Sequence, residues 1–133
     1  GSYIVRALAA SDLFKRKTIA VAGRSEAKLR TTLDEIALDI GVDEVRGYPT
    51  IIADSSDEES LASMAKQATV IINAVGPYRL HGESVVRAAI DNGANHIDVS
   101  GEPAYLEKVE MKYAERAREA GVYVVGACGY GNV

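Results

Sequence analysis

Two cations and a hydroxyl group follow a short apolar run near the start of the chain. Residues 18–23 are almost entirely apolar, and Arg24, Ser25 and Lys28 come next. Such a run is typical of a strand that is buried on both faces of a parallel sheet. At the end of the second strand of a dinucleotide-binding fold, a carboxylate accepts from the ribose 2′-hydroxyl, whereas a cation pairs with a 2′-phosphate. The three residues therefore predict a site for NADP rather than NAD.

Each of the three residues also has a simpler explanation. Arg24 could be a solvated residue at the end of a strand, and Lys28 a solvated lysine on the following helix. Ser25 is a plausible N-cap for that helix, in which case its hydroxyl serves the backbone. Both interpretations stay open for each residue.

A second candidate site lies at residues 69–78, TVIINAVGPY, where a run of strand formers ends in a tight turn of small residues. Ligands of open parallel sheets bind outside the carboxyl ends of the strands. In this turn Gly76 leaves room for a close backbone approach, Asn73 offers a donor and an acceptor, and Tyr78 could stack on a ring or line the pocket. The candidate cofactor-binding residues are Asn73, Val75, Gly76, Pro77 and Tyr78. The alternative is a structural turn before the next helix.

Asp54 follows a second buried-strand candidate over residues 49–53. In the dinucleotide-binding fold the residue after the third strand lies near the adenine, so Asp54 is a candidate acceptor for the exocyclic amine. Alternatively, Asp54 only leads into the next helix, for which Ser56 is predicted as the N-cap and Glu59 as its capping-box partner.

No set of residues forms a recognisable catalytic centre. His81, Asp98 and Glu102 are candidates for contact with a substrate or a nicotinamide. The alternatives are that His81 is a solvated loop histidine, which is the commoner role, and that Glu102 caps the following helix. Cys128 at a strand end is a candidate nucleophile, but a small buried cysteine is the commoner role. The two histidines lack neighbours at metal-ligand spacing, so no metal site is predicted. No tyrosine is followed four residues later by a lysine, so the catalytic tyrosine–lysine pair of short-chain dehydrogenases is not present in the sequence.

The elements that must position these residues alternate strictly between strands and helices. This alternation requires right-handed crossovers and a parallel sheet. The sequence therefore predicts an α/β fold of the Rossmann type, with a doubly wound parallel sheet. Strands are expected over residues 18–22, 49–53, 69–73, 95–100 and 122–127, and helices over residues 1–10, 26–40, 56–67, 83–92 and 105–120.

A helix precedes the first expected strand, which is unusual because the doubly wound order begins with a strand and a glycine-rich turn. We therefore expect the first strand and most of that turn to lie upstream of this sequence. Gly1 stands where the last glycine of the turn would enter the helix, and it is a candidate cofactor contact; Gly1-Ser2 could equally be a cloning scar.

Composition narrows the functional class. The 133 residues are 47% hydrophobic and 26% charged, with a formal net charge of −4, as expected for one globular domain. No stripe of lysine and arginine is present, so nucleic acid is not expected as a partner. No apolar run approaches the roughly 20 residues of a membrane helix. The single cysteine fits a reducing compartment, so we expect an intracellular protein.

Four segments together resemble the saccharopine dehydrogenase-like oxidoreductases, relatives of saccharopine dehydrogenase and of bacterial trans-acting enoyl reductases. The similarity covers nearly the whole chain, with the motifs in the same order. After the cysteine the family usually continues Gly-Phe-Asp-Ser, whereas here Gly129, Tyr130, Gly131 and Asn132 follow, so the acidic residue is absent. The segments are AVAGRSEAKL from Ala20, MAKQATVIINAVGPYRLHGESVVRAAIDNGA from Met64, IDVSGEPAYLE from Ile97 and GVYVVGACGY from Gly121.

The resemblance implies a partial NAD(P)-binding Rossmann domain over residues 1–133, with NADP held through Arg24 and the Gly76-Pro77 turn, and a substrate domain after Val133. It also implies a link to lipid droplets and membranes, so cytoplasmic, lipid-droplet and peripheral membrane locations are all compatible, as is a homo-oligomer. The expected function is NADP-dependent hydride transfer to an unidentified small-molecule or lipid-related substrate. The alternative is an inactive nucleotide-binding or interaction module at a lipid surface.

Overall fold

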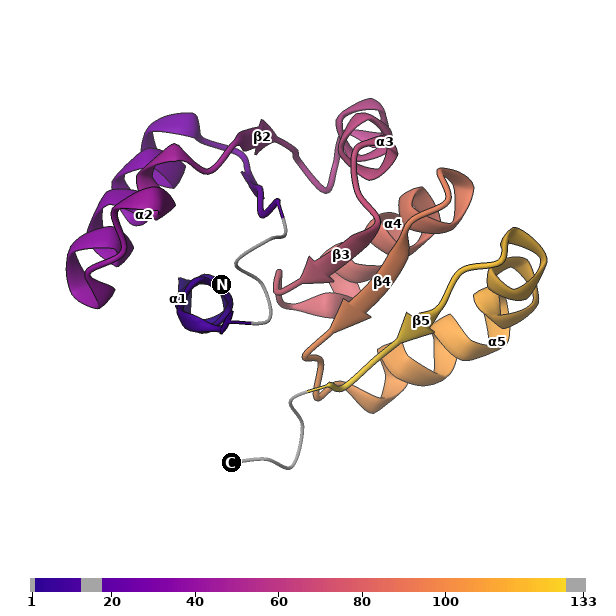
Figure 1. The fold of residues 1–133 in the computed structure, drawn as a ribbon. Helices are drawn as coiled ribbons and strands as arrows, with labels where there is room; N and C mark the ends of the chain where they lie inside the picture. Colours follow the sequence, from indigo (N-terminus) through magenta and orange to yellow (C-terminus); the bar gives the residue numbers. More distant parts are fainter. Residues whose placement is uncertain (1, 13–17, 129–133) are drawn as a thin grey trace. The chain divides into compact units, whose positions relative to one another are not determined.

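The computed structural model describes residues 2–12 and 18–128, which form two compact units (Figure 1). The first unit extends to Ala53 and the second begins at Asp54. Each unit combines parallel strands with helices, and each is described by itself below.

The first unit contains two parallel strands and the helices around them. Its elements are α1 (Ser2–Ala10), β1 (Val21–Gly23), α2 (Glu26–Ile40), the 3₁₀ helix η2 (Asp43–Gly47) and β2 (Thr50–Ile52). β1 pairs with β2 in parallel, with Val21 opposite Thr50 and Gly23 opposite Ile52. The two strands therefore end at the same edge of the sheet.

Helix α2 supplies most of the core of the first unit. Leu33, Ile36 and Ala37 recur at helical spacing and are buried against Val45 of η2. α2 ends at Gly41, which has φ = 69° and so adopts the left-handed conformation that glycine favours at this position. α1 lies against α2, and an ion pair joins Arg6 of α1 to Asp39 of α2.

The second unit contains a three-stranded parallel sheet in the order β3-β4-β5. Its register places Asn73 at the end of β3 opposite Asp98 at the end of β4. Its elements are α3 (Glu58–Lys66), β3 (Val70–Asn73), α4 (Tyr78–Asp91), β4 (Asn95–Asp98), α5 (Pro103–Ala120) and β5 (Val124–Val125).

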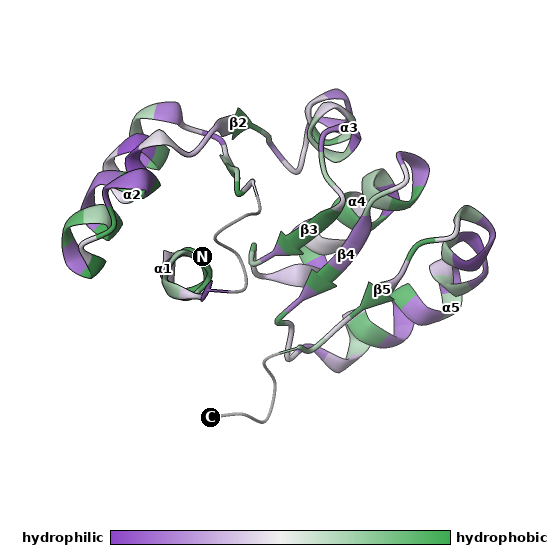
Figure 2. Ribbon diagram, viewed as in Figure 1, coloured by the Kyte–Doolittle hydropathy of each residue, from purple (hydrophilic) through white to green (hydrophobic). Residues whose placement is uncertain are grey.

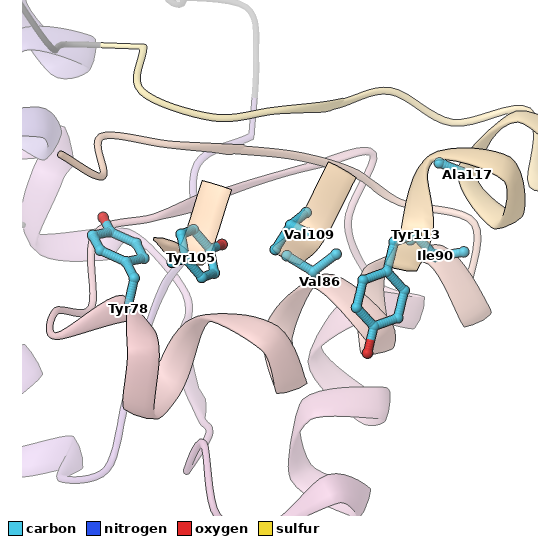
Figure 3. Packing of buried hydrophobic residues seen from close by; sticks show 7 residues of the cluster. All are labelled: Tyr78, Val86, Ile90, Tyr105, Val109, Tyr113 and Ala117. Atoms are coloured by element: carbon cyan, nitrogen blue, oxygen red, sulfur yellow. The ribbon is translucent and has the colours of Figure 1, made fainter. Parts of the chain in front are cut away.

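The core of the second unit lies where α4 packs against α5 (Figure 3). The rings of Tyr78 and Tyr105 lie side by side, with centroids 5.3 Å apart and planes tilted by 36°. Gly82 makes this contact possible, since a Cβ atom there would come within 2.4 Å of Cε1 of Tyr105. The buried cluster comprises Tyr78, Val86, Ile90, Tyr105, Val109, Tyr113 and Ala117.

The strands and helices occur in the predicted order, but several boundaries differ. The first strand begins at Val21 instead of Thr18 and is only partly buried, with Ala22 exposed. The predicted strand over residues 122–127 shortens to β5, because the chain after Val125 turns through Ala127 at φ = 59°. The strands form two separate sheets among the described residues, as expected for a doubly wound sheet whose first strand lies upstream of this sequence.

Two predicted helix starts are wrong. Ser56 does not cap α3: the N-cap is Asp57, whose carboxylate accepts from the backbone amides of Glu59 and Ser60. The helix expected to start at Glu83 begins five residues earlier, at Tyr78, since a carboxylate supplied by Glu102 satisfies its first amides. In neither case does the cap follow from the spacing used in the prediction.

The strand pairing nevertheless follows the doubly wound pattern. In the order 3-2-1-4-5-6, strands 3 and 2 pair on one side of strand 1, and strands 4, 5 and 6 pair on the other. The observed groups, β2-β1 and β3-β4-β5, are these two sets in the same sequence order. No strand corresponding to strand 1 occurs among residues 2–12 and 18–128.

Candidate functional site

The residues after β1 form a small hollow in the first unit. β1 ends at Gly23, whose carbonyl accepts from the amide of Ala53 at 2.9 Å. Arg24 therefore leaves the sheet at its carboxyl end, where ligands of such folds bind. The hollow has a volume of about 390 Å³ and is lined by Gly23, Arg24, Ser25, Lys28, Leu29 and Thr32.

Ser25 does cap α2, as one of its two interpretations predicted. Its Oγ accepts from the amide of Lys28 at 3.3 Å, and its backbone is extended. This bond uses one acceptor site of the hydroxyl, whose hydrogen can still be donated to a ligand. The start of α2 also carries the partial positive charge of a helix N-terminus, which favours an anion there.

The two cations of this hollow have no carboxylate partner within the described part of the chain. Most other cations there do: ion pairs hold Arg6, Arg46, Arg87, Lys108, Lys112, Arg116 and Arg118. Arg30 donates instead to the carbonyls of Arg46 and Tyr48. Arg24 and Lys28 thus line one hollow with unneutralised charge, which fits a phosphate monoester.

A larger hollow in the second unit has a different character. It measures about 710 Å³, lies along α5 and β5, and is lined mainly by apolar and aromatic side chains. Its arginine, Arg118, is paired with Glu115 at 3.5 Å. This hollow therefore offers no unneutralised cation for a phosphate among its described lining residues.

Asp54 forms the turn that leads into α3. Its Oδ1 accepts from the amide and the hydroxyl of Ser56, at 2.9 and 2.7 Å, and its carbonyl accepts from the amide of Asp57. These bonds favour the interpretation of Asp54 as a residue that leads into the helix. The other predicted contact, Gly1, lies outside the described residues.

The turn after β3 is held together by its own side chains. Asn73 is 4% exposed; its Oδ1 accepts from the amide of Val75, and its carbonyl accepts from the hydroxyl of Tyr78 at 2.7 Å. The Tyr78 ring lies in the core at 6% exposure and packs against Tyr105, which leaves little of its face for stacking on a ligand ring. The alternative, that Tyr78 lines the pocket, stays a prediction. Val75, Gly76 and Pro77 are exposed, and the Gly76-Pro77 peptide bond is cis.

Gly76 is the feature of this turn most suited to a ligand. Apart from the two neighbouring residues in the chain, the nearest atom that a Cβ atom there would meet is in the ring of Tyr78, at 4.0 Å. Packing within the chain therefore does not require glycine at this position. A ligand that approaches the backbone closely would require it.

Glu102 and Asp98 bind groups of the protein. The carboxylate of Glu102 accepts from the amides of Tyr78 and Arg79 at the start of α4. Asp98 is 2% exposed and accepts from the amides of Ser100 and Ala127 and from the hydroxyl of Tyr105. Burial, reinforced by Asp98, raises the pKa of Tyr105 above its usual range, so its hydroxyl stays protonated and donates.

His96 belongs to the same buried polar group, and the sequence analysis did not identify its partner. Its side chain is fully buried on β4, and Nε2 lies 3.3 Å from Nδ2 of Asn73. Burial lowers the pKa of His96 to about 4, so the ring is neutral at pH 7 and Nε2 can accept from Asn73. The alternation of β3 and β4 could have identified this pair, because the two residues point to the same face of adjacent strands.

The remaining candidates are His81 and Cys128. His81 is on α4, with Nδ1 2.8 Å from Oγ of Ser55, and Cys128 is exposed. Within residues 2–12 and 18–128 no histidine, cysteine and carboxylate side chains gather into a metal-binding group. In the same ranges, no helix has the length and apolar character needed to cross a bilayer.

The model of the saccharopine dehydrogenase NADP binding domain matches residues 1–125 of the chain. The chain belongs to this family. The predicted family and cofactor, NADP, are thereby confirmed, and the hollow with Arg24 and Lys28 is chemically suited to the phosphate that distinguishes NADP from NAD.

Two relatives are similar over most of the chain. The "Lipid droplet localized protein" of Caenorhabditis elegans is 55% identical over 133 residues, covering all of this chain and 31% of the relative. The "Saccharopine dehydrogenase-like oxidoreductase" of Homo sapiens is 48% identical over 115 residues, covering 86% of this chain and 27% of the relative. The chain thus spans less than a third of the length of these two relatives.

A solved structure confirms the Rossmann-type α/β fold of this saccharopine dehydrogenase-like chain. The apo, histidine-tagged saccharopine dehydrogenase (L-Glu forming) of Saccharomyces cerevisiae matches it with a TM-score of 0.68 and 23% identity. The match covers 96% of this chain and 24% of that chain. At 23% identity this comparison establishes the similarity of the fold alone.

Proposed function

We propose that this chain is the cofactor-binding part of an NADP-dependent oxidoreductase, and that Arg24 and Lys28 hold the 2′-phosphate of the cofactor. The observation that carries the proposal is the pair of unneutralised cations lining one hollow at the carboxyl end of β1. Ser25 adds a hydroxyl at the start of α2. NADPH, when bound, supplies the hydride; the protein supplies binding, orientation and electrostatics.

The other proposed cofactor contacts lie in the turn after β3, at Asp54 and at Gly1. Gly76 contributes a backbone that a ligand can approach, with Val75 and Pro77 exposed beside it. Asn73 and Tyr78 shape this turn through hydrogen bonds inside the protein. Asp54 remains a proposed contact for the adenine, and Gly1 for the phosphate turn.

The proposal is tested by measuring the affinities of the protein for NADPH and NADH through the fluorescence of the reduced nicotinamide. We expect Arg24→Ala to weaken NADPH binding by about 10- to 100-fold, the range for losing one charge-assisted contact, and to leave NADH binding unchanged. Lys66→Ala is the matched control, because Lys66 is an exposed cation in the last turn of α3 and does not line the hollow. Equal affinities for the two nucleotides before and after Arg24→Ala would refute the proposal.

The reaction itself is proposed only as a class. The relatives named oxidoreductases, together with the "Trans-acting enoyl reductase" of Mycobacterium ulcerans at 33% identity, support hydride transfer to an imine, carbonyl or enoyl group. They also support a longer parent polypeptide with a substrate domain. NADPH oxidation by the parent protein with such substrates tests this class.

A second candidate function is a nucleotide-binding module at a lipid surface without turnover. The name of the C. elegans relative, "Lipid droplet localized protein", favours it, as do the internal hydrogen bonds of Asp98 and Glu102. Flotation of the protein with lipid droplets, together with no NADPH oxidation above background, would support it. Substrate-dependent oxidation would exclude it.

A further inference from the structure

His81 joins two turns of the second unit that are both proposed to contact the cofactor. Its ring Nδ1 lies 2.8 Å from Oγ of Ser55, in the turn that leads into α3. Its backbone amide donates to the carbonyl of Pro77 at 3.2 Å, at the start of α4. Ser55 directly follows Asp54, and Pro77 directly follows Gly76. We call these two contacts of His81 the His81 bridge.

Ser84 holds Ser55 from one turn further along α4. Its Oγ donates to the carbonyl of Ser55 at 3.1 Å, and the carbonyl of His81 lies slightly farther away, at 3.3 Å. His81 and Ser84 are three positions apart, so they share one face of the helix. Ser55 is thus held by both its hydroxyl and its carbonyl. This double attachment favours a structural role for the Ser55–His81 pair over activation of Ser55 as a nucleophile.

The turn that contains Ser55 is closed by its own hydrogen bonds. Oδ1 of Asp54 accepts from the amide of Ser56, and the carbonyl of Asp54 accepts from the amide of Asp57. The amide of Asp54 donates to Oγ of Ser60 at 3.0 Å. Asp54 is therefore fixed relative to Ser55, and the side chains that hold Ser55 also hold Asp54.

Helices α3 and α4 are joined by more than the His81 bridge. Both carry hydrophilic as well as hydrophobic residues (Figure 2), and they pack against each other. An ion pair between Arg87 and Glu58, at 3.7 Å, also links them. Loss of the His81 side chain should therefore disturb the turn locally and leave the two helices together.

We propose that His81 is a positioning residue for the cofactor, because it sets the position of the Asp54 turn relative to the Gly76-Pro77 turn. This inference rests on the proposed function, in which Asp54 contacts the adenine and the backbone at Gly76 approaches the cofactor. A single side-chain hydrogen bond contributes modestly to the free energy, so the effect on affinity should be moderate. Because Arg24 and Lys28 hold the 2′-phosphate in that function, the His81 bridge should affect NADPH and NADH equally.

The test measures the affinities of variants of the protein for NADPH and NADH. We expect His81→Ala to weaken both by about 3- to 10-fold and to leave their ratio unchanged. His81→Asn should bind within about twofold of the unsubstituted protein, because the asparagine amide takes the place of the imidazole Nδ1. Ser84→Ala should also weaken both nucleotides. Ser63→Ala is the matched control, since Ser63 is an exposed serine of α3, and it should change neither affinity.

A double variant separates the Ser55–His81 bond from other effects of the substitutions. Ser55→Ala should match His81→Ala, and the double variant should bind no more weakly than either single variant, because both remove the same bond. Additive losses would overturn the proposal. A His81→Ala protein that binds both nucleotides normally, or a His81→Asn protein as weak as His81→Ala, would overturn it as well.

Hydrogen exchange gives a second readout, which needs no nucleotide. The amides of Ser56 and Asp57, both bonded to Asp54, should exchange faster in His81→Ala and return toward the original rate in His81→Asn. Unchanged exchange in His81→Ala would overturn the proposal. An NADPH-to-NADH affinity ratio near one in the unsubstituted protein would instead refute the 2′-phosphate site, and the exchange rates together with the shared loss of affinity would still decide the role of His81.

Discussion

The backbone amide of Tyr78 donates to Oε2 of Glu102 at 2.7 Å, so α4 begins against a carboxylate from the loop before α5. The amide of Arg79 donates to the other oxygen of the same carboxylate at 3.1 Å. In nucleotide-binding folds a helix start often receives a phosphate of the ligand. Here Glu102 occupies that position at the start of α4, whereas the start of α2 is flanked by the unneutralised Arg24 and Lys28.

Removing the Glu102 carboxylate should therefore destabilise α4. Glu102→Ala leaves two amides of the first helical turn without their partner, and we expect a loss of about 1–2 kcal/mol in the free energy of unfolding. Glu102→Gln keeps one acceptor oxygen and should lose less. Urea denaturation followed by circular dichroism measures both; no loss with Glu102→Ala would contradict the capping role.

Gly82 and Gly76 should differ in how strongly a substitution by alanine affects stability. Gly82→Ala places a Cβ atom 2.4 Å from the Tyr105 ring, and we expect a loss of about 1–3 kcal/mol in stability through overpacking. Gly76→Ala has 4.0 Å of clearance, so its stability should change by less than about 0.5 kcal/mol. If the backbone of this turn approaches the cofactor, Gly76→Ala should still weaken NADPH binding severalfold. Thermal melts and NADPH titrations distinguish the two effects.

Glu83 should make the stability depend on pH in acid. Hydrogen bonds from Lys112, Lys108 and Tyr113 lower its pKa from 4.5 to about 2. Because the folded-state pKa lies below the unfolded one, the stabilisation is complete above pH 4.5 and is lost as the pH falls toward 2. Glu83→Gln should flatten the stability profile in this window. An unchanged slope between pH 4.5 and 2.5 would show that these bonds contribute nothing.

His96 should act in a different pH window. Burial lowers its pKa from 6.5 to about 4, so the unfolded chain binds the proton more readily than the folded chain. Stability should therefore be complete above pH 6.5 and fall between pH 6.5 and 4, by on the order of 3 kcal/mol from this group. Titration of the His96 ring protons by NMR gives the folded-state pKa directly. A midpoint near 6.5 would contradict the buried, neutral ring.

Much of the fold follows from residues that act locally. Leu33 and Ile36 recur at helical spacing and do face the core, Gly41 ends α2, and Ser25 caps it. The strand over residues 70–73 was predicted from its run of strand formers and the strand over residues 95–98 from its alternation, and both lie where expected. These features depend on near neighbours in the sequence, which is why patterns of spacing identify them.

The features that the sequence could not predict arise where distant residues decide the outcome. α4 begins at Tyr78 because Glu102, 24 positions away, caps it. The Tyr78 ring turned out to be buried because Tyr105 and the space above Gly82 accommodate it. Asp98 was considered as a ligand contact, but Ser100, Tyr105 and Ala127 use its oxygens. These contacts join residues of different elements, so the spacing of residues within one helix or strand cannot predict them.

The ratio of the dissociation constants for NADH and NADPH tests the central claim most directly. If Arg24 and Lys28 hold the 2′-phosphate, the protein should bind NADPH at least 10-fold more tightly than NADH, and the double variant Arg24→Ala/Lys28→Ala should bring the ratio close to one. The preference should also weaken with increasing salt, since the two cations lie at the surface. A ratio near one in the unsubstituted protein, or a preference that survives the double variant, would contradict the account.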